Sequence, residues 1–561
     1  MYFKGSILNM FRGLGDIKNK QSFMKPFSIL LVIVSLSLYI FSIFITRVSV
    51  LQEANFLAML KTYPLTYWFS IFFILFALCI SKEKMIYLEL SLLYIFLINT
   101  PYFVESNIRE GSAYWPLGMA DQITQTGSLP TIGGPYVFFP GYICFASMVS
   151  QTLSLPLDLI LKVLSVVMNL TLLWNVFIMN RFLFPNTSSR LIVFPMLLFI
   201  AGSWTNVMYF HPMSMAFLIF ISILNIALKR QFIGLSHCRY ILIIIVLGYF
   251  SIVITHMLVP LFIASFLVLY FSTSRMLEGR SRKIAPICLF LTIFFTWLVF
   301  QAYPFFRAYL KKETAYLADL PRLYGGVTSG RGPFIGSTDY LIVFWTRVGL
   351  MLILIGLSSI GILKIFRQKE GKTISKGNTT LILSYISGAV SLILIPYGGE
   401  IFTRTFYFLL PILVFLAALA LRGHQRTATV LILLLLIMQP IAYVGDESTI
   451  LVSDYVIGGA SFFQKHFAPN VKYIGPAPLI FYFDTYGPPN YKNYYSVGEH
   501  RFNQTYIAEL AKSDWNYYCD YQTIRNYYAW FLGFDLSDMF INSTLLNRLY
   551  DGGGFKIFGK T

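Results

Sequence analysis

The stretch PFSILLVIVSLSLYIFSIFI, Pro26 to Ile45, decides the fold class, because twenty successive residues carry no charge. An α-helix of about 20 residues crosses the ~30 Å hydrocarbon core of a membrane at 1.5 Å per residue. Apolar runs of this kind recur along the chain, which is 57% hydrophobic and only 12% charged over 561 residues. The pattern predicts a polytopic membrane protein built from α-helices, because the shorter strands of a membrane barrel do not need such runs.

The charges predict the orientation of the chain. The net charge is +18, yet residues 445–561 hold 9 Lys and Arg against 11 Asp and Glu, so the excess lies in residues 1–444. There the basic residues gather in short loops between apolar runs, which is the pattern of cytoplasmic loops. The charge therefore indicates orientation and no nucleic-acid partner. The basic N-terminus lacks a small-residue cleavage site, so we expect it to be cytoplasmic and its first helix to be retained.

Placing the basic loops inside gives a consistent topology of about thirteen transmembrane helices. The segment 138–153 is the exception, because a crossing there would move every later basic loop to the outer face. We therefore expect an interfacial or re-entrant helix on the outer face at 138–153. Large outer loops are expected at about 102–156, 203–211 and 304–338. The expected spans lie near 23–45, 66–81, 85–101, 157–180, 190–203, 207–228, 239–255, 257–273, 284–303, 339–363, 379–396, 402–421 and 427–444.

The composition changes after Val444. Residues 445–561 contain no apolar run long enough to span, and acids, Asn, Tyr and turn residues become frequent. Short apolar segments such as VKYIGPAPLIFYF (471–483) occur beside helix-like stretches such as QTYIAELAKS (504–513). This mixture predicts a small soluble α/β or α+β domain. The sequence thus predicts an all-α polytopic membrane bundle over 1–444 and an extracytoplasmic domain over 445–561.

Carboxylates gather in the first expected outer loop. The stretch VESNIREGSAYWPLGMAD (104–121) holds Glu105, Glu110 and Asp121 within eighteen residues of a chain that otherwise has few acids. A solvated loop whose acids pair with Arg109 is the simpler explanation. The aromatic residues between the acids, which favour the membrane interface, make the loop a candidate for chemistry.

Other polar residues expected on the outer face lie close to helix ends. Each has a simpler explanation: a histidine that only packs, cations that meet lipid headgroups, or a Glu400–Arg404 helix pair. Together with the acids they would suit a transfer from a lipid-linked phosphate. A carboxylate would accept a proton from the acceptor, while nearby cations would stabilise charge on the leaving phosphate. The candidates for substrate binding are Asp121, Tyr209, His211, His256, Arg331, Glu400 and Arg404.

Four stretches of the chain carry a family resemblance. They are EGSAYWPLGMADQITQTGSLPTIGGPYVFFPGYICFASM (110–148), GSWTNVMYFHPMSMAFLIFI (202–221), VITHMLVPLFIASFLVLY (253–270) and NRLYDGGGFKIF (547–558). They resemble the outer loops, a Ser/Thr-His helix junction and a closing strand hairpin of the GT-C superfamily of integral-membrane glycosyltransferases, in particular archaeal-type members with a C-terminal soluble domain. The resemblance implies a multi-pass enzyme that transfers a sugar, with inversion, from a polyprenyl-phosphate-linked donor to a glycan, lipid or protein acceptor.

The resemblance also implies roles for residues of the outer loops. An Asp or Glu of the first outer loop acts as the base or as the acceptor-orienting group, and this catalytic role maps to Glu110 or else to Glu105. The second outer loop offers Tyr209 and His211 where oligosaccharyltransferases and protein mannosyltransferases carry an acid. This difference disfavours a metal-dependent mechanism, because a divalent cation needs several oxygen ligands. No cofactor is therefore expected, with a divalent cation kept as the alternative.

Phosphate-binding roles map by the same resemblance to Arg404, Arg331 and His256. The expected partners are a lipid-linked sugar donor, its acceptor and membrane lipids. Two other functions stay open on the sequence alone. One is a transporter or flippase of lipid-linked glycans, which would bury ionisable groups near the bilayer midplane and often show inverted repeats. The other is a non-catalytic membrane assembly protein whose soluble domain binds a partner.

Overall fold

A computed structural model gives the arrangement of most of the membrane part and of five strands in the C-terminal part. The residues that it describes are 17–49, 58–81, 83–108, 113–129, 135–183, 189–205, 210–233, 238–278, 285–307, 338–367, 376–394, 401–444, 457–459, 462, 466, 473–475, 494–496, 517–521, 546–551 and 555–560.

Within these residues, eight helical segments are long and apolar enough to cross a membrane, and four shorter helices are also apolar. The chain is therefore a multi-pass α-helical membrane protein, as the sequence predicts. The long segments are α2 (Ile17–Ser49), α5 (Glu83–Tyr94) continued by η2 (Ile95–Asn99) and α6 (Thr100–Val104), α10 (Leu157–Leu183), α12 (Pro212–Ile233), α14 (Leu258–Glu278), α18 (Thr338–Arg367), α20 (Ile401–Leu421) and α21 (Gln425–Val444). The shorter ones are α4 (Leu65–Ile80), α11 (Ser189–Gly202), α13 (Cys238–Thr255) and α15 (Ala285–Phe300).

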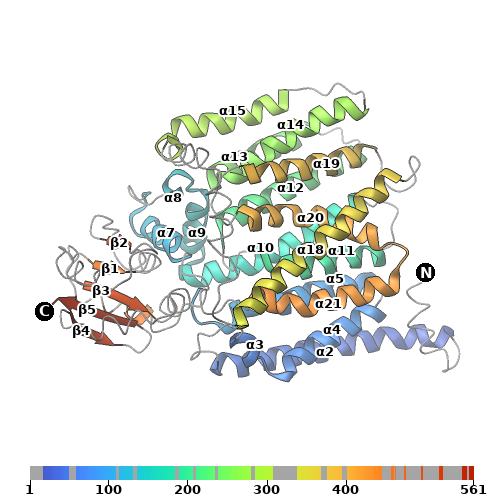
Figure 1. The fold of residues 1–561 in the computed structure, drawn as a ribbon, viewed down its shortest axis with the longest axis horizontal. Coiled ribbons are helices and arrows are strands. Elements are labelled where there is room, and N and C mark those ends of the chain that lie inside the picture. The colour runs from blue at the N-terminus through green and yellow to red at the C-terminus, as the bar shows by residue number, and fades with distance from the viewer. Residues whose placement is uncertain are drawn as a thin grey trace.

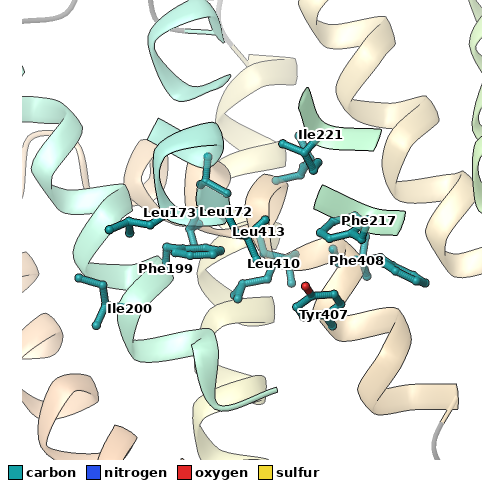
Figure 2. Packing of buried hydrophobic residues seen from close by; sticks show 14 of the residues in the cluster. Leu172, Leu173, Phe199, Ile200, Phe217, Ile221, Tyr407, Phe408, Leu410 and Leu413 are labelled. Atoms are coloured by element: carbon teal, nitrogen blue, oxygen red, sulfur yellow. The ribbon is translucent and has the colours of Figure 1, made fainter. Parts of the chain in front are cut away.

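Helix α20 lies at the centre of the bundle. Seventeen of its residues are buried, including its run from Thr405 to Ala417. Figure 2 shows Phe408 and Leu410 of α20 among side chains of α10, α11 and α12. Helix α18 packs on it closely, because Gly361 leaves room where a Cβ would lie 2.1 Å from the Leu416 carbonyl oxygen. The centre of the bundle is thus a buried, aromatic-rich core.

Helix α5 continues through a π-helical turn, η2, into the short helix α6, where the helical segment ends. In a π-helix the backbone bonds run from i to i+5, which leaves carbonyl groups to be satisfied by other donors. The Phe96 carbonyl accepts hydrogen bonds from the Tyr67 hydroxyl (2.7 Å) and the Thr100 hydroxyl (2.5 Å). Asn99, the last residue of η2, accepts a bond of 2.9 Å from the Asn169 amide of α10. Neighbouring helices therefore stabilise the irregular turn inside the bundle.

Three short helices lie together at one end of the bundle, on the same side as the β-sheet (Figure 1). They are α7 (Tyr114–Thr126), α8 (Pro135–Phe138) and α9 (Gly141–Leu153). With 13 residues, α9 is too short to cross the ~30 Å hydrocarbon core. It packs on α7 and α10 in a separate apolar cluster that includes Tyr114, Ile143 and Leu161. A short non-spanning helix is what the sequence predicts for 138–153.

The C-terminal part contains a five-stranded sheet. Its order is β2-β1-β3-β5-β4, with β1 parallel to β2 and β3, and β5 antiparallel to β3 and β4. Parallel neighbours need crossover connections, so the sheet agrees with an α/β or α+β unit. The closing hairpin of NRLYDGGGFKIF is β4 and β5, as predicted. The strands are β1 (Tyr473–Gly475), β2 (Tyr494–Ser496), β3 (Tyr517–Tyr521), β4 (Leu546–Asp551) and β5 (Phe555–Lys560).

Candidate functional site

Two histidines cap the N-termini of α12 and α14. The Nδ1 atom of His211 accepts a hydrogen bond of 3.1 Å from the Met213 amide, and Nδ1 of His256 accepts one of 3.2 Å from the Leu258 amide. The first amides of a helix have no partner within it, so a side-chain acceptor here stabilises the helix start. Only 7% of His211 and 9% of His256 are exposed.

The two histidines lie close to Arg404, in the first turn of α20. Their ring centroids are 6.2 Å apart, and the Arg404 guanidinium donates towards the Met213 sulfur at 3.9 Å. Burial first, and the Arg404 charge second, lower the pKa of His256 from 6.5 to about 3. Burial, the Arg404 charge and His256 together lower the pKa of His211 well below its ordinary value. We call His211, His256 and Arg404 the His–Arg cluster. Burial and the Arg404 charge both favour the neutral form of its two imidazoles.

The first residues of α9 contact the residues that precede both histidines. The Tyr142 hydroxyl donates a hydrogen bond to the Phe210 carbonyl, and the centroids of the two aromatic rings lie 4.6 Å apart. A Cβ on Gly141 would lie 2.6 Å from the Thr255 hydroxyl oxygen, so glycine permits this close approach. Phe210 and Thr255 directly precede the two histidines in the chain. Two successive residues of α9 thus fix the positions of both, which places the His–Arg cluster at the end of the bundle that carries α7 to α9.

Sequence reasoning missed Gly141, Tyr142 and Thr405. The first two belong to the segment FFPGYICF, whose Pro-Gly pair marks a turn into a helix but indicates no contact with a distant histidine. Thr405 follows Arg404, is buried, and its hydroxyl has no hydrogen-bond partner among the described residues. No pattern in the sequence points to Thr405, because its burial depends on the packing of α20.

Glu105 lies on different helices from those that carry the His–Arg cluster. It ends α6, is 8% exposed, and its backbone carbonyl accepts a hydrogen bond of 3.0 Å from the Lys162 ammonium of α10. The Ser106 carbonyl accepts from the same ammonium. These bonds fix the point where the chain leaves the bundle towards the acidic loop. Glu105 is therefore placed by α6 and α10, whereas the His–Arg cluster is built on α12, α14 and α20.

Asp121 has a local role in α7. Its carboxylate accepts a hydrogen bond of 2.7 Å from the Gln125 amide one turn later, and partial burial raises its pKa. The described contact supports the helix itself. The other four site candidates, Glu110, Tyr209, Arg331 and Glu400, lie outside the described residues.

In the described part of the chain, no group of three or more His, Cys, Asp or Glu side chains is arranged to hold a metal ion. In the His–Arg cluster each histidine uses Nδ1 to cap its own helix, and Nε2 of His256 has no side-chain partner in the described part of the chain.

No family model matches the chain, and no curated protein matches it in sequence. Among solved structures, it is similar to the oligosaccharyltransferase of Archaeoglobus fulgidus in the apo form, with a TM-score of 0.51 and 11% identity over 85% of this chain and 74% of that one. ArnT from Cupriavidus metallidurans, solved bound to undecaprenyl phosphate, gives a TM-score of 0.48 and 11% identity over 85% of this chain and 97% of that one. The likeness to the oligosaccharyltransferase shows that the chain shares the fold of that membrane protein.

Proposed function

We propose that the protein is a membrane glycosyltransferase. It moves a sugar, with inversion, from a polyprenyl-phosphate-linked donor to a glycan, lipid or protein acceptor on the outer face of the membrane. The observation that carries this proposal is the His–Arg cluster. It joins the N-termini of three helices, an arginine and two buried histidines at one end of the bundle.

This arrangement has the chemistry of a phosphate site. The N-terminus of a helix carries a partial positive charge of about half a unit and presents donors to anions. Helices α12, α14 and α20 each begin at the cluster, and Arg404 adds a full charge in the first turn of α20. Arginine matches phosphate geometry with its planar fork of donors. A phosphate ester at the head of a membrane lipid is therefore the ligand that the cluster fits best.

The reacting carboxylate is Glu110 or Glu105 in this proposal. The carboxylate accepts the proton of an acceptor hydroxyl or amide, and the acceptor atom bonds to the anomeric carbon of the sugar. The bond from that carbon to the phosphate oxygen breaks, and its electron pair stays on the phosphate. Arg404 stabilises this charge. Tyr209, Arg331 and Glu400 stay predicted substrate contacts, and Asp121 supports α7.

The orientation is part of the proposal. Basic loops between the helices support a cytoplasmic N-terminus, which places α7 to α9, the His–Arg cluster and the sheet on the outer face. The donor phosphate then lies at the headgroup level of the outer leaflet. There the polyprenyl chain can stay in the hydrocarbon while the sugar faces water.

The test is transfer by the purified full-length protein from a panel of radiolabelled polyprenyl-phosphate sugars to a mixed acceptor extract. Arg404→Ala is expected to lower the rate by about 10²–10³-fold, because it removes a charge stabiliser of the transition state. Gly356→Ala is the control, since nothing lies within 4 Å of a Cβ at that position. Full transfer by both Glu105→Gln and Glu110→Gln would overturn the catalytic assignment. Movement of a lipid-linked glycan across proteoliposomes with its glycosidic bond intact would favour a flippase instead.

A further inference from the structure

The two histidines of the cluster share one capping geometry. In each, Nδ1 accepts a hydrogen bond from the backbone amide two residues later, at the first or second residue of a long helix. An imidazole nitrogen that accepts a hydrogen bond carries no proton. The single ring proton of each histidine must therefore be on Nε2, and each ring is a neutral donor at its distal edge.

The Nε2 atom of His256 has no hydrogen-bond partner among the residues that the structure describes. Its Nδ1 bond to Leu258 is its only side-chain hydrogen bond there, although the side chain is more than nine-tenths buried. Nε2 is not among the fully buried side-chain atoms that lack a partner, so this donor edge reaches accessible surface, where a ligand or water can bind it. The centroid of the His211 ring lies 6.2 Å from that of His256, and the Arg404 charge acts on both rings.

We propose that His256 binds the phosphate of the lipid donor as a fixed neutral Nε2–H donor, and that it exchanges no proton during the reaction. This inference rests on the proposed function and assigns a role within the same site. His256 has two tasks: Nδ1 fixes the start of α14, and Nε2–H binds a phosphate oxygen. Because the leaving phosphate receives no proton from this ring, its charge is stabilised by Arg404, the Nε2–H donor of His256 and the helix N-termini.

Burial and the nearby guanidinium agree with this role. Both effects disfavour a protonated ring, and protonation of Nδ1 would also break the bond that caps the helix. A general acid at this position would need the opposite: a ring protonated near neutral pH, with a carboxylate as its partner. The described partners of the rings are backbone amides and an arginine.

Two substitutions of His256 separate its two tasks. Asparagine places an amide oxygen close to the position of Nδ1, so His256→Asn keeps an acceptor for the Leu258 amide and loses the distal donor. Glutamine places its amide nitrogen close to the position of Nε2, so His256→Gln keeps the distal donor and loses the cap. His424→Asn is the matched control, because His424 is exposed in the turn between α20 and α21.

The experiment measures melting temperature and affinity for farnesyl phosphate in the purified full-length protein, with farnesol as the ligand that lacks phosphate. We expect His256→Asn to melt close to wild type and bind farnesyl phosphate about tenfold or more weakly. We expect His256→Gln to melt lower and keep its affinity within about threefold. Wild-type affinity in His256→Asn, or an equal loss of affinity in a folded His256→Gln, would overturn the inference.

A second measurement tests the ring state directly. The ¹⁵N spectrum of histidine-labelled protein, assigned by comparison with His256→Asn, should show a neutral Nε2–H ring at pH 7 and again at pH 5. An imidazolium signal from His256 at pH 5 would contradict the proposal. If wild type bound neither farnesyl phosphate nor any sugar donor, the proposed function would fail, and this spectrum would still decide the state of the ring.

Discussion

Gly141→Ala offers a sharp test of how α9 positions His256. A Cβ at residue 141 would lie 2.6 Å from the Thr255 hydroxyl oxygen and 2.9 Å from a side-chain carbon of Ile254. Ordinary contacts begin near 3.4 Å, so the hydroxyl must recede by about 0.8 Å. The hydroxyl is not free to do so, because it donates a bond of 2.6 Å to the Ser251 carbonyl.

The displacement must therefore pass to the backbone at the end of α13, where His256 is the next residue. Inserting a methyl group into a packed contact typically costs about 1–3 kcal/mol of stability. A misplacement of about 1 Å in a reactive site can cost about 10²-fold in rate. We expect Gly141→Ala to lower the melting temperature by several degrees and to lower the transfer rate by a larger factor than this loss of stability explains.

The assay is melting temperature in detergent together with farnesyl phosphate affinity and sugar transfer. Gly356→Ala is the control and should melt at or slightly above wild type, because alanine favours a helix over glycine by about 0.5–1 kcal/mol. Thr255→Ala combined with Gly141→Ala should recover part of the loss, since the closest contact is removed. If Gly141→Ala matched Gly356→Ala in melting, affinity and transfer, α9 would not position His256 and the reasoning would be refuted.

Three further predictions concern the same end of the bundle. Tyr142→Phe leaves the Phe210 carbonyl without its buried donor, so unfolding should need about 1–3 kcal/mol less free energy, and an unchanged melting temperature would contradict this. The pKa of His256 is about 3 in the folded protein against 6.5 in the unfolded chain, so the unfolded chain binds the proton first and stability falls as pH drops below 6.5. At pH 5 the loss should be about 2 kcal/mol, and melting curves of His256→Asn should show a smaller dependence. Arg404→Lys keeps the charge but loses the planar fork, so transfer should fall between wild type and Arg404→Ala, and a rate equal to wild type would exclude a bidentate contact.

The membrane architecture could be predicted because hydropathy and loop charge act locally along the chain. The spans expected at 66–81 and 239–255 are α4 and α13 almost to the residue. The span expected at 207–228 begins too early, because α12 starts at Pro212. Proline favours the first position of a helix, and its missing amide ends the ladder there. This boundary matters, because His211 lies just outside the helix and its ring caps the helix start.

The site could be predicted only in part. His211, His256 and Arg404 stood out as polar residues near helix ends, and the structure brings the three together. The residues that position this cluster could not be found from the sequence pattern, since the hydrogen bond between Tyr142 and Phe210 joins residues 68 positions apart. No local pattern encodes such a contact. The roles of Glu105 and Glu110 stay predictions.

The π-turn η2 has a consequence for comparing this chain with other helical membrane proteins. A π-turn holds one residue more than the α-helical turn that it replaces, so a relative with a regular helix would be one residue shorter between Tyr94 and Thr100. An alignment that forbids gaps inside membrane helices would then misassign every position that follows, including Glu105, by one. A single gap within Ile95–Asn99 restores the correspondence. When acidic residues of other membrane proteins with this fold are matched to this loop, the gap belongs in the helix and not in the loop.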